Sequence, residues 1–173
     1  VAAGFGPGDV SEWFRLEDLH FAAYLQGELT FQEQRRHRLA DFLGRPVSES
    51  LDPLFARYLA AYEAAWLAFS DVVPALTSLA AAGVRLGVLT NGQQEQQAAK
   101  LTAIGVLPLV QCVVSSSTLP TAKPDPAAFL AACDRMSCEP SRTRSGGDNL
   151  QPGAPGASPP RPRGVAPDAP ARP

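Results

Sequence analysis

The sequence predicts an α/β protein in which a bundle of helices, residues 1–70, precedes a doubly wound parallel sheet, residues 71–150. In the first part apolar residues recur every three or four positions, which is typical of amphipathic helices. In the second part helical patterns alternate with short apolar runs, which is typical of buried parallel strands joined by helices. Residues 151–173 contain eight of the seventeen prolines and no aromatic side chain, so we expect them to be disordered.

Local signals place the first two helices. Residues 12–25 carry a broad apolar stripe, which predicts a helix with one buried side. Thr30 and Glu33 predict a capping box, in which each side chain accepts a hydrogen bond from the backbone N–H of the other residue. The helix that begins there should run to Leu43 and end at Gly44, because glycine readily adopts the left-handed conformation that follows a helix.

A third helix is predicted from Asp52 to about Phe69. Asp52 suits the N-cap position and Pro53 suits the first turn, where its missing N–H costs nothing. The aromatic residues of this segment fall three or four positions apart and should form one continuous face in the core of the bundle: Phe55, Tyr58, Tyr62, Trp66 and Phe69.

Beyond residue 71 the pattern predicts three helices and two strands. Gly83 and Gly105 each follow a helical pattern and should close it, whereas Pro126 should open the last helix. The predicted elements are a helix over 72–82, a strand over 84–89, a helix over 93–104, a strand over 110–114 and a helix over 126–136.

Composition and charge argue against several functions. The formal net charge of −2 gives no electrostatic basis for binding nucleic acid or a membrane surface. No apolar run approaches the ~20 residues of a membrane span. His20 and His37 are expected to have surface or helix-packing roles. The three cysteines are expected to be reduced thiols in a cytoplasmic protein: Cys112, Cys133 and Cys138.

Two short segments carry the residues best suited to chemistry. Thr90, Asn91 and Gly92 follow the first predicted strand, at the sheet edge where ligands bind in open α/β folds. Lys123 precedes the helix that opens at Pro126. A hydroxyl, free backbone N–H groups and an ammonium can together hold a phosphate. The sequence therefore predicts a phosphate site at this edge.

These two segments and a third one resemble a known family of hydrolases. Thr90-Asn91-Gly92, then Ala122-Lys123-Pro124-Asp125-Pro126, then Gly147-Asp148-Asn149 resemble the second, third and fourth motifs of the haloacid dehalogenase superfamily. The helical front part is similar to the helical cap of that superfamily. The resemblance covers about residues 10–150, and it implies a Rossmann-type core.

The resemblance implies a Mg²⁺-dependent phosphomonoesterase that acts on a small phosphorylated metabolite through an aspartyl phosphate. It implies that Thr90 donates its hydroxyl, and Asn91 its backbone N–H, to the phosphate. Lys123 would be a catalytic residue that neutralises charge on the phosphate and on the nucleophile, and Asp148 would lie near Mg²⁺. Phosphoglycolate, sugar phosphates and nucleoside monophosphates are all candidate substrates.

The sequence departs from the family pattern in its acidic residues. No aspartate is followed by another two positions later, so the Asp-x-Asp nucleophile motif and its first core strand are absent, and Gly153 stands where a second acid is expected after Asp148. We therefore expect a chain that is truncated at its front, altered after about Cys138 and inactive as it stands. Two alternatives stay open: a metal-independent 2-haloacid dehalogenase, and a non-catalytic fragment or binding module. The sequence does not indicate the oligomeric state.

A basic cluster lies in the second predicted helix, over residues 35–38. We expect its side chains to form a solvated face, balanced by nearby acidic residues. The alternative is that they contact the anionic group of a substrate.

Overall fold

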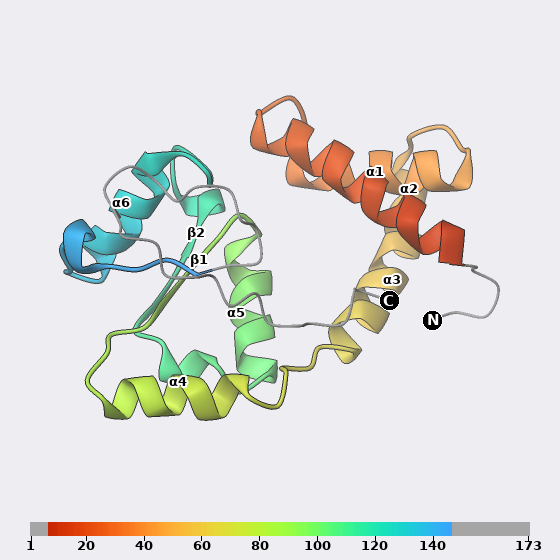
Figure 1. The fold of residues 1–173 in the computed structure, drawn as a ribbon. Helices are drawn as coiled ribbons and strands as arrows, with labels where there is room; N and C mark the ends of the chain where they lie inside the picture. Colours follow the sequence, from red (N-terminus) through yellow and green to blue (C-terminus); the bar gives the residue numbers. More distant parts are fainter. Residues whose placement is uncertain (1–6, 147–173) are drawn as a thin grey trace. The chain divides into compact units, whose positions relative to one another are not determined.

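The computed structural model describes residues 7–146, which fold into two compact units that meet in sequence between Ala65 and Trp66 (Figure 1). The proposed disorder of residues 151–173 concerns a segment outside the described residues. No helix within the described range is long and apolar enough to cross a bilayer.

The first unit is helical. It contains α1 (Pro7–Leu25), α2 (Phe31–Leu43), a 3-10 turn (Glu49–Leu51) and α3 (Asp52–Ala64). Figure 1 shows α1 lying along α2. The core of the unit is formed by buried residues of α2, the 3-10 turn and the first turn of α3: Leu39, Ala40, Leu51 and Phe55. Partly buried hydrophobic residues pack against them: Trp13, Leu43 and Tyr58.

Both ends of α2 are those that the sequence predicts. Thr30 Oγ1 accepts a hydrogen bond from the Glu33 N–H at 3.2 Å, and Glu33 Oε2 accepts one from the Thr30 N–H at 2.7 Å. Gly44 adopts the left-handed conformation, with φ of 61°, and its N–H bonds to carbonyls of the last turn. The capping box and the glycine end of α2 are therefore confirmed.

The third helix differs from the prediction at both ends. Asp52 already has helical backbone angles, because the 3-10 turn leads directly into α3, so Asp52 is not the N-cap. The helix ends at Ala64 and not at Phe69. Leu67 and Phe69 are 90% and 68% exposed, so the aromatic face does not continue past the helix. Most helices in proteins are stabilised by packing against a core. The core of this unit lies at the start of α3, so residues after Ala64 have no core to pack on.

The basic cluster of α2 is not a solvated face, which corrects the prediction. Arg38 is only 4% exposed, and its guanidinium carbon lies 3.8 Å from the centroid of the Trp13 ring. Its Nη2 donates to Glu17 at 3.1 Å. Arg36 makes a two-pronged pair with Asp52, at 2.8 and 2.6 Å. Charge counting could not reveal this, because the aromatic faces that receive Arg38 lie on other helices.

The histidines have the helix-packing role that the sequence predicts. His20 is buried between α1 and α2, and its Nε2 lies 2.8 Å from Asp41 Oδ2. The ring of His37 lies 5.6 Å from that of His20.

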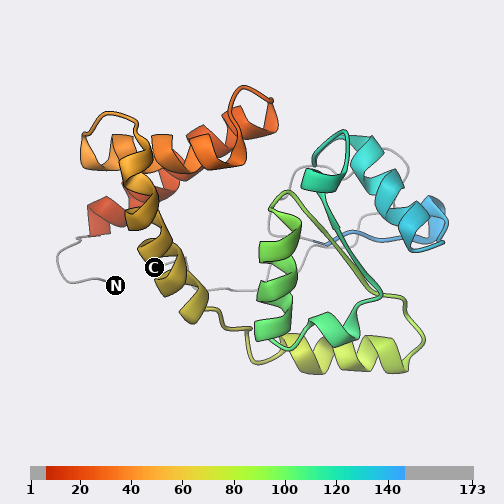
Figure 2. The same cartoon turned by 180° about the vertical axis from the view of Figure 1, so that it is seen from behind.

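The second unit is built around two parallel strands, β1 (Gly87–Thr90) and β2 (Cys112–Ser115). Gly87 pairs with Cys112 and Thr90 with Ser115, so both strands end at the same edge. Figure 2 shows the strand pair between α5 and α6. The helices are α4 (Val72–Ala81), α5 (Gln94–Ala103) and α6 (Pro126–Arg135), with 3-10 turns at Leu107–Leu109, Ser116–Thr118 and Pro140–Arg142.

The helices of this unit match their predicted positions to within one residue, whereas the strands begin two or three residues later than predicted. The first strand is also not buried on both sides: Gly87 is exposed and the rest of β1 is half-buried. Among the described residues β1 has one strand neighbour, so its other edge is not paired with a strand. In β2, by contrast, Val114 and Ser115 are completely buried. The full doubly wound sheet stays a prediction.

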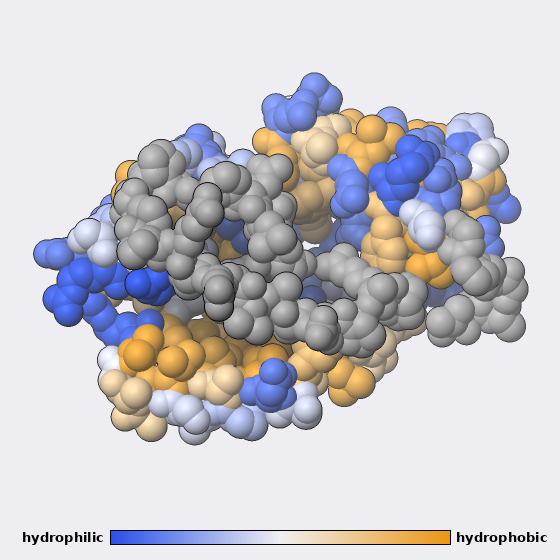
Figure 3. Space-filling model, in the orientation of Figure 1, coloured by the Kyte–Doolittle hydropathy of each residue, from blue (hydrophilic) through white to orange (hydrophobic). Residues whose placement is uncertain are grey.

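Apolar surface gathers on α4. Figure 3 shows hydrophobic residues along the position of this helix. None of its residues is fully buried, and Val73 and Leu79 are 36% and 44% exposed. This helix is the least covered apolar element of the second unit.

Candidate phosphate-binding site

The loop after β1 presents a hydroxyl at the strand end. Thr90 is the last residue of β1 and is half-buried. Its Oγ1 accepts a hydrogen bond from the Gly92 N–H at 3.2 Å, which folds the loop back on the strand. Because that bond uses only an oxygen lone pair, the hydroxyl hydrogen stays available for a ligand.

The side chain of Asn91 connects this loop to Lys123. Asn91 Nδ2 donates to the Lys123 carbonyl at 2.8 Å, and the Lys123 N–H donates to Asn91 Oδ1 at 2.8 Å. One amide side chain thus satisfies both backbone groups of a residue 32 positions away. This contact brings the first two motifs together. The sequence indicated a role only for the Asn91 backbone; the positioning role of its side chain was missed.

Lys123 lies just before α6, whose start is fixed by local chemistry. Asp125 accepts a hydrogen bond from the Ala127 N–H at 2.8 Å and so caps the helix, and Pro126 occupies the first turn. No ion pair among residues 7–146 involves Lys123. The Lys123 backbone is therefore held by Asn91 and by the start of α6. Its ammonium is not neutralised by a described carboxylate.

A run of three serines, which begins with the last residue of β2, is hydrogen-bonded to the loop after β1. Ser115 is completely buried, and its hydroxyl donates to the Gly92 carbonyl. Ser116 Oγ donates to the Asn91 carbonyl at 3.0 Å, and Ser117 Oγ accepts from the Gln94 N–H at 3.3 Å. Sequence reasoning missed these residues, although one signal was available. Hydroxyl side chains that follow one parallel strand lie beside the loop that follows its neighbour.

The described residues hold the phosphate part of the predicted site but no metal centre. Asp148 lies outside them. Among residues 7–146 no group of three or more His, Cys, Asp or Glu side chains is arranged to hold a metal ion. The nearby Asp125 carboxylate is already used as a helix cap. The described residues therefore do not by themselves fit a Mg²⁺ site.

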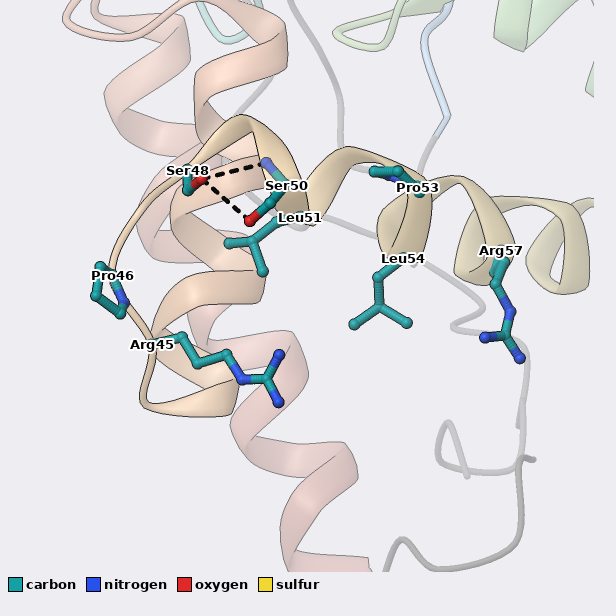
Figure 4. Close-up of a pocket in the computed structure, with 8 residues that line it drawn as sticks. All are labelled: Arg45, Pro46, Ser48, Ser50, Leu51, Pro53, Leu54 and Arg57. Carbon is teal, nitrogen blue, oxygen red and sulfur yellow. Dashed lines mark hydrogen bonds between the residues drawn. The ribbon is translucent and has the colours of Figure 1, made fainter.

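The helical unit carries a separate groove of about 590 Å³, shown in Figure 4. The side chain of Leu54 lies between those of Arg45 and Arg57. Neither arginine is in an ion pair among the described residues, so the groove is positively charged and suits an anionic group. The groove is lined by Arg45, Pro46, Ser48, Ser50, Leu51, Pro53, Leu54 and Arg57.

Comparison with known proteins identifies one family. A family model for haloacid dehalogenase-like hydrolases matches residues 3–158. The chain belongs to this family. The matched range includes the Thr-Asn-Gly segment and the lysine before α6.

Two phosphatases are among its relatives. The phosphoglycolate phosphatase of Rhodospirillum rubrum is 38% identical over 98 residues, which are 54% of this chain and 41% of that protein. The validoxylamine A 7'-phosphate phosphatase of Streptomyces hygroscopicus subsp. limoneus is 30% identical over 120 residues, 60% of this chain and 56% of that protein. The chain thus spans about half the length of these curated relatives.

A dehalogenase is also related. The (S)-2-haloacid dehalogenase 1 of a Pseudomonas species is 34% identical over 74 residues, 43% of this chain and 33% of that protein. Among solved structures, the family hydrolase YfnB of Bacillus subtilis bound to magnesium has a TM-score of 0.63 at 18% identity, over 76% of this chain and 59% of that one. This likeness shows a common fold.

Proposed function

We propose that this chain is part of a phosphomonoesterase that acts on a small phosphorylated metabolite. The observation that carries the proposal is the pair of hydrogen bonds from the Asn91 side chain to the backbone of Lys123. It brings a hydroxyl, loop amides and a lysine to one sheet edge. These three kinds of donor suit the tetrahedral, multiply charged phosphate group.

Each residue has a distinct part in the proposed site. The Thr90 hydroxyl and the Asn91 N–H bind phosphate oxygens, while Lys123 neutralises charge that would otherwise repel an anionic nucleophile. The Asn91 side chain and the serine run position these donors and do not touch the substrate. Asp148 is proposed to lie near Mg²⁺, which when bound supplies charge neutralisation at the phosphate.

The nucleophile is not among these residues. No Asp-x-Asp motif occurs in the 173 residues, and neither Thr90 nor Lys123 can replace a carboxylate that forms a labile acyl phosphate. We therefore propose that these 173 residues bind phosphate without turning over a phosphate ester, and that turnover requires the aspartate motif on the same polypeptide.

A dehalogenase is the second candidate, favoured by the 34% identity to the Pseudomonas enzyme. The two functions differ in what they need from Lys123. Phosphate ester hydrolysis requires a cation at a multiply charged group, and in this family it uses Mg²⁺. Displacement of halide by a carboxylate leaves a neutral ester and requires no metal.

The test uses the protein isolated from its own cells, assayed with and without a chelator. Release of inorganic phosphate from phosphoglycolate or glyceraldehyde 3-phosphate that stops with the chelator supports the phosphatase. Halide release from a 2-haloacid that persists with the chelator favours the dehalogenase and contradicts the proposal. Absence of both activities in a protein whose intact mass includes an Asp-x-Asp segment would favour a non-catalytic binding module.

A further inference from the structure

Two cysteines meet where α6 ends. Ser137 is in the left-handed region, with φ of 49°. The Cys138 N–H donates to the Cys133 carbonyl, and the Ser137 N–H to the Asp134 carbonyl, each at 3.0 Å. These two bonds define a Schellman motif, which brings the side chains three residues inside and two residues past the helix end into contact. An apolar pair usually fills those positions; here both residues are cysteines.

The turn that holds the pair is fixed from outside. Arg85 Nη1 donates to the carbonyls of Met136 and Ser137, both at 2.9 Å. Cys138 Sγ lies 3.2 Å from Thr143 Oγ1 and 3.5 Å from the Cys133 carbonyl oxygen. The side chains of Cys133 and Cys138 also interact with each other. The effective concentration of each thiol for the other is therefore high.

The two thiols differ in accessibility. Cys133 is 6% exposed, whereas Cys138 is partly exposed. Burial raises the pKa of the Cys133 thiol, as it does that of Cys112 on β2. An oxidant from solvent therefore meets Cys138 before its partner. Among residues 7–146 no cluster suited to a metal ion includes these cysteines.

We propose that Cys133 and Cys138 are a dithiol site that a peroxide converts to an intramolecular disulfide. The Cys138 thiolate attacks one peroxide oxygen, the O–O bond breaks, and Cys138 becomes a sulfenic acid as hydroxide leaves. The Cys133 sulfur then attacks the Cys138 sulfur, and the sulfenic hydroxyl leaves as water with the thiol proton. Two thiols lose two electrons in total, and one peroxide is reduced to two waters.

The test treats the reduced full chain with hydrogen peroxide, alkylates the thiols that stay free and maps the tryptic peptides. The intact protein should lose the mass of two hydrogen atoms and keep one alkylated thiol, at Cys112. Trypsin cleaves after Arg135 but not between Lys123 and Pro124, so the peptide that begins at Met136 should be linked to the peptide over residues 101–135. Within that peptide Cys112 should carry the alkyl group, which assigns the link to Cys133. A thiol reductant should release it.

Variants separate this pair from the third cysteine. Cys112→Ser should leave the disulfide unchanged, whereas Cys138→Ser, at a partly exposed position, should abolish it. Cys133→Ser should abolish it too. A link that persists in Cys133→Ser, or that disappears in Cys112→Ser, would assign the disulfide to Cys112 and overturn the proposal. So would oxidation of the wild type to separate sulfinic acids with no linked peptide, a result that requires no variant to fold.

Discussion

In the helical unit Arg38 is buried against the Trp13 ring and paired with Glu17, whereas Lys123 in the second unit is held through its backbone alone. The charge of Arg38 is therefore neutralised within the helical unit by neighbouring side chains. Lys123 keeps its charge available, because Asn91 binds only its peptide groups. The comparison shows how one chain separates a cation that stabilises the fold from a cation that serves a ligand.

The same contrast extends to the polar residues around each cation. In the helical unit they pair side chain to side chain, as Arg36 does with Asp52. At the edge of β1 and β2 they bind backbone groups, as Ser116 does with the Asn91 carbonyl. Polar side chains that bind loop backbone fix the loop shape without neutralising charge, which suits a site that must receive an anion.

Removing the Lys123 ammonium should give the largest effect, a loss of turnover. Lys123→Ala in the catalytically complete protein should lower turnover about 10²–10³-fold, because no other described cation replaces it at the phosphate. The midpoint of thermal unfolding should barely change. Lys100→Ala, at the one other lysine of the chain, is the matched control and should retain activity. Unchanged turnover in Lys123→Ala would remove Lys123 from the site.

Removing the Arg38 cation should lower stability and leave phosphate binding unchanged. Arg38→Met keeps the volume but loses the contact with Trp13 and the pair with Glu17, so the helical unit should be destabilised by ~2 kcal/mol. Denaturant unfolding followed by tryptophan fluorescence measures this. Phosphate binding by the second unit should be retained; its loss would erase the contrast between the two cations.

The hydroxyl at the strand end should contribute less than the lysine. Thr90→Val keeps the shape but removes one donor to the phosphate, and turnover should fall about tenfold. Thr102→Val, whose hydroxyl bonds only to the Ala98 carbonyl on α5, is the control. A large loss of stability in Thr90→Val, with unchanged phosphate affinity of the protein that stays folded, would make Thr90 a turn former.

The smallest expected effect is on the stability of the helical unit at acidic pH. The hydrogen bond from Arg36 holds the pKa of Asp52 below its ordinary value of 3.8. A depressed folded pKa adds stability above the unfolded value, and this stability is lost as the pH falls through the folded pKa. In Asp52→Asn the stability of the helical unit should therefore fall less steeply as the pH drops below about 4. Unfolding followed by circular dichroism across that pH range measures this dependence. The same dependence in the variant and the wild type would show that the Arg36–Asp52 pair does not cause it.

The sequence predicted the elements whose causes are local. The capping box at Thr30 and the left-handed Gly83 and Gly105, with φ of 78° and 72°, set helix ends through neighbouring backbone groups. Thr90 and Lys123 were identified because a strand end and a helix start are visible as patterns. Whether these residues bind phosphate stays a prediction.

What the sequence could not predict depends on distant partners. The bounds of β1 follow from its register with β2, and α3 ends early because its later residues lack a core to pack on. Arg38 is buried by rings on α1 and α3. Asn91 contacts a residue 32 positions away, and no local pattern encodes that distance.

The most direct test of the account is a titration of the chain with inorganic phosphate, followed by the backbone amide NMR signals of the loop and of Lys123. In the wild type the signals of Asn91, Gly92 and Lys123 should shift together with one dissociation constant. In Asn91→Ala, which loses both bonds to Lys123, affinity should fall and the Lys123 signal should no longer follow the loop. Equal affinity in the variant, with all three signals still moving together, would contradict the claim that Asn91 assembles the site.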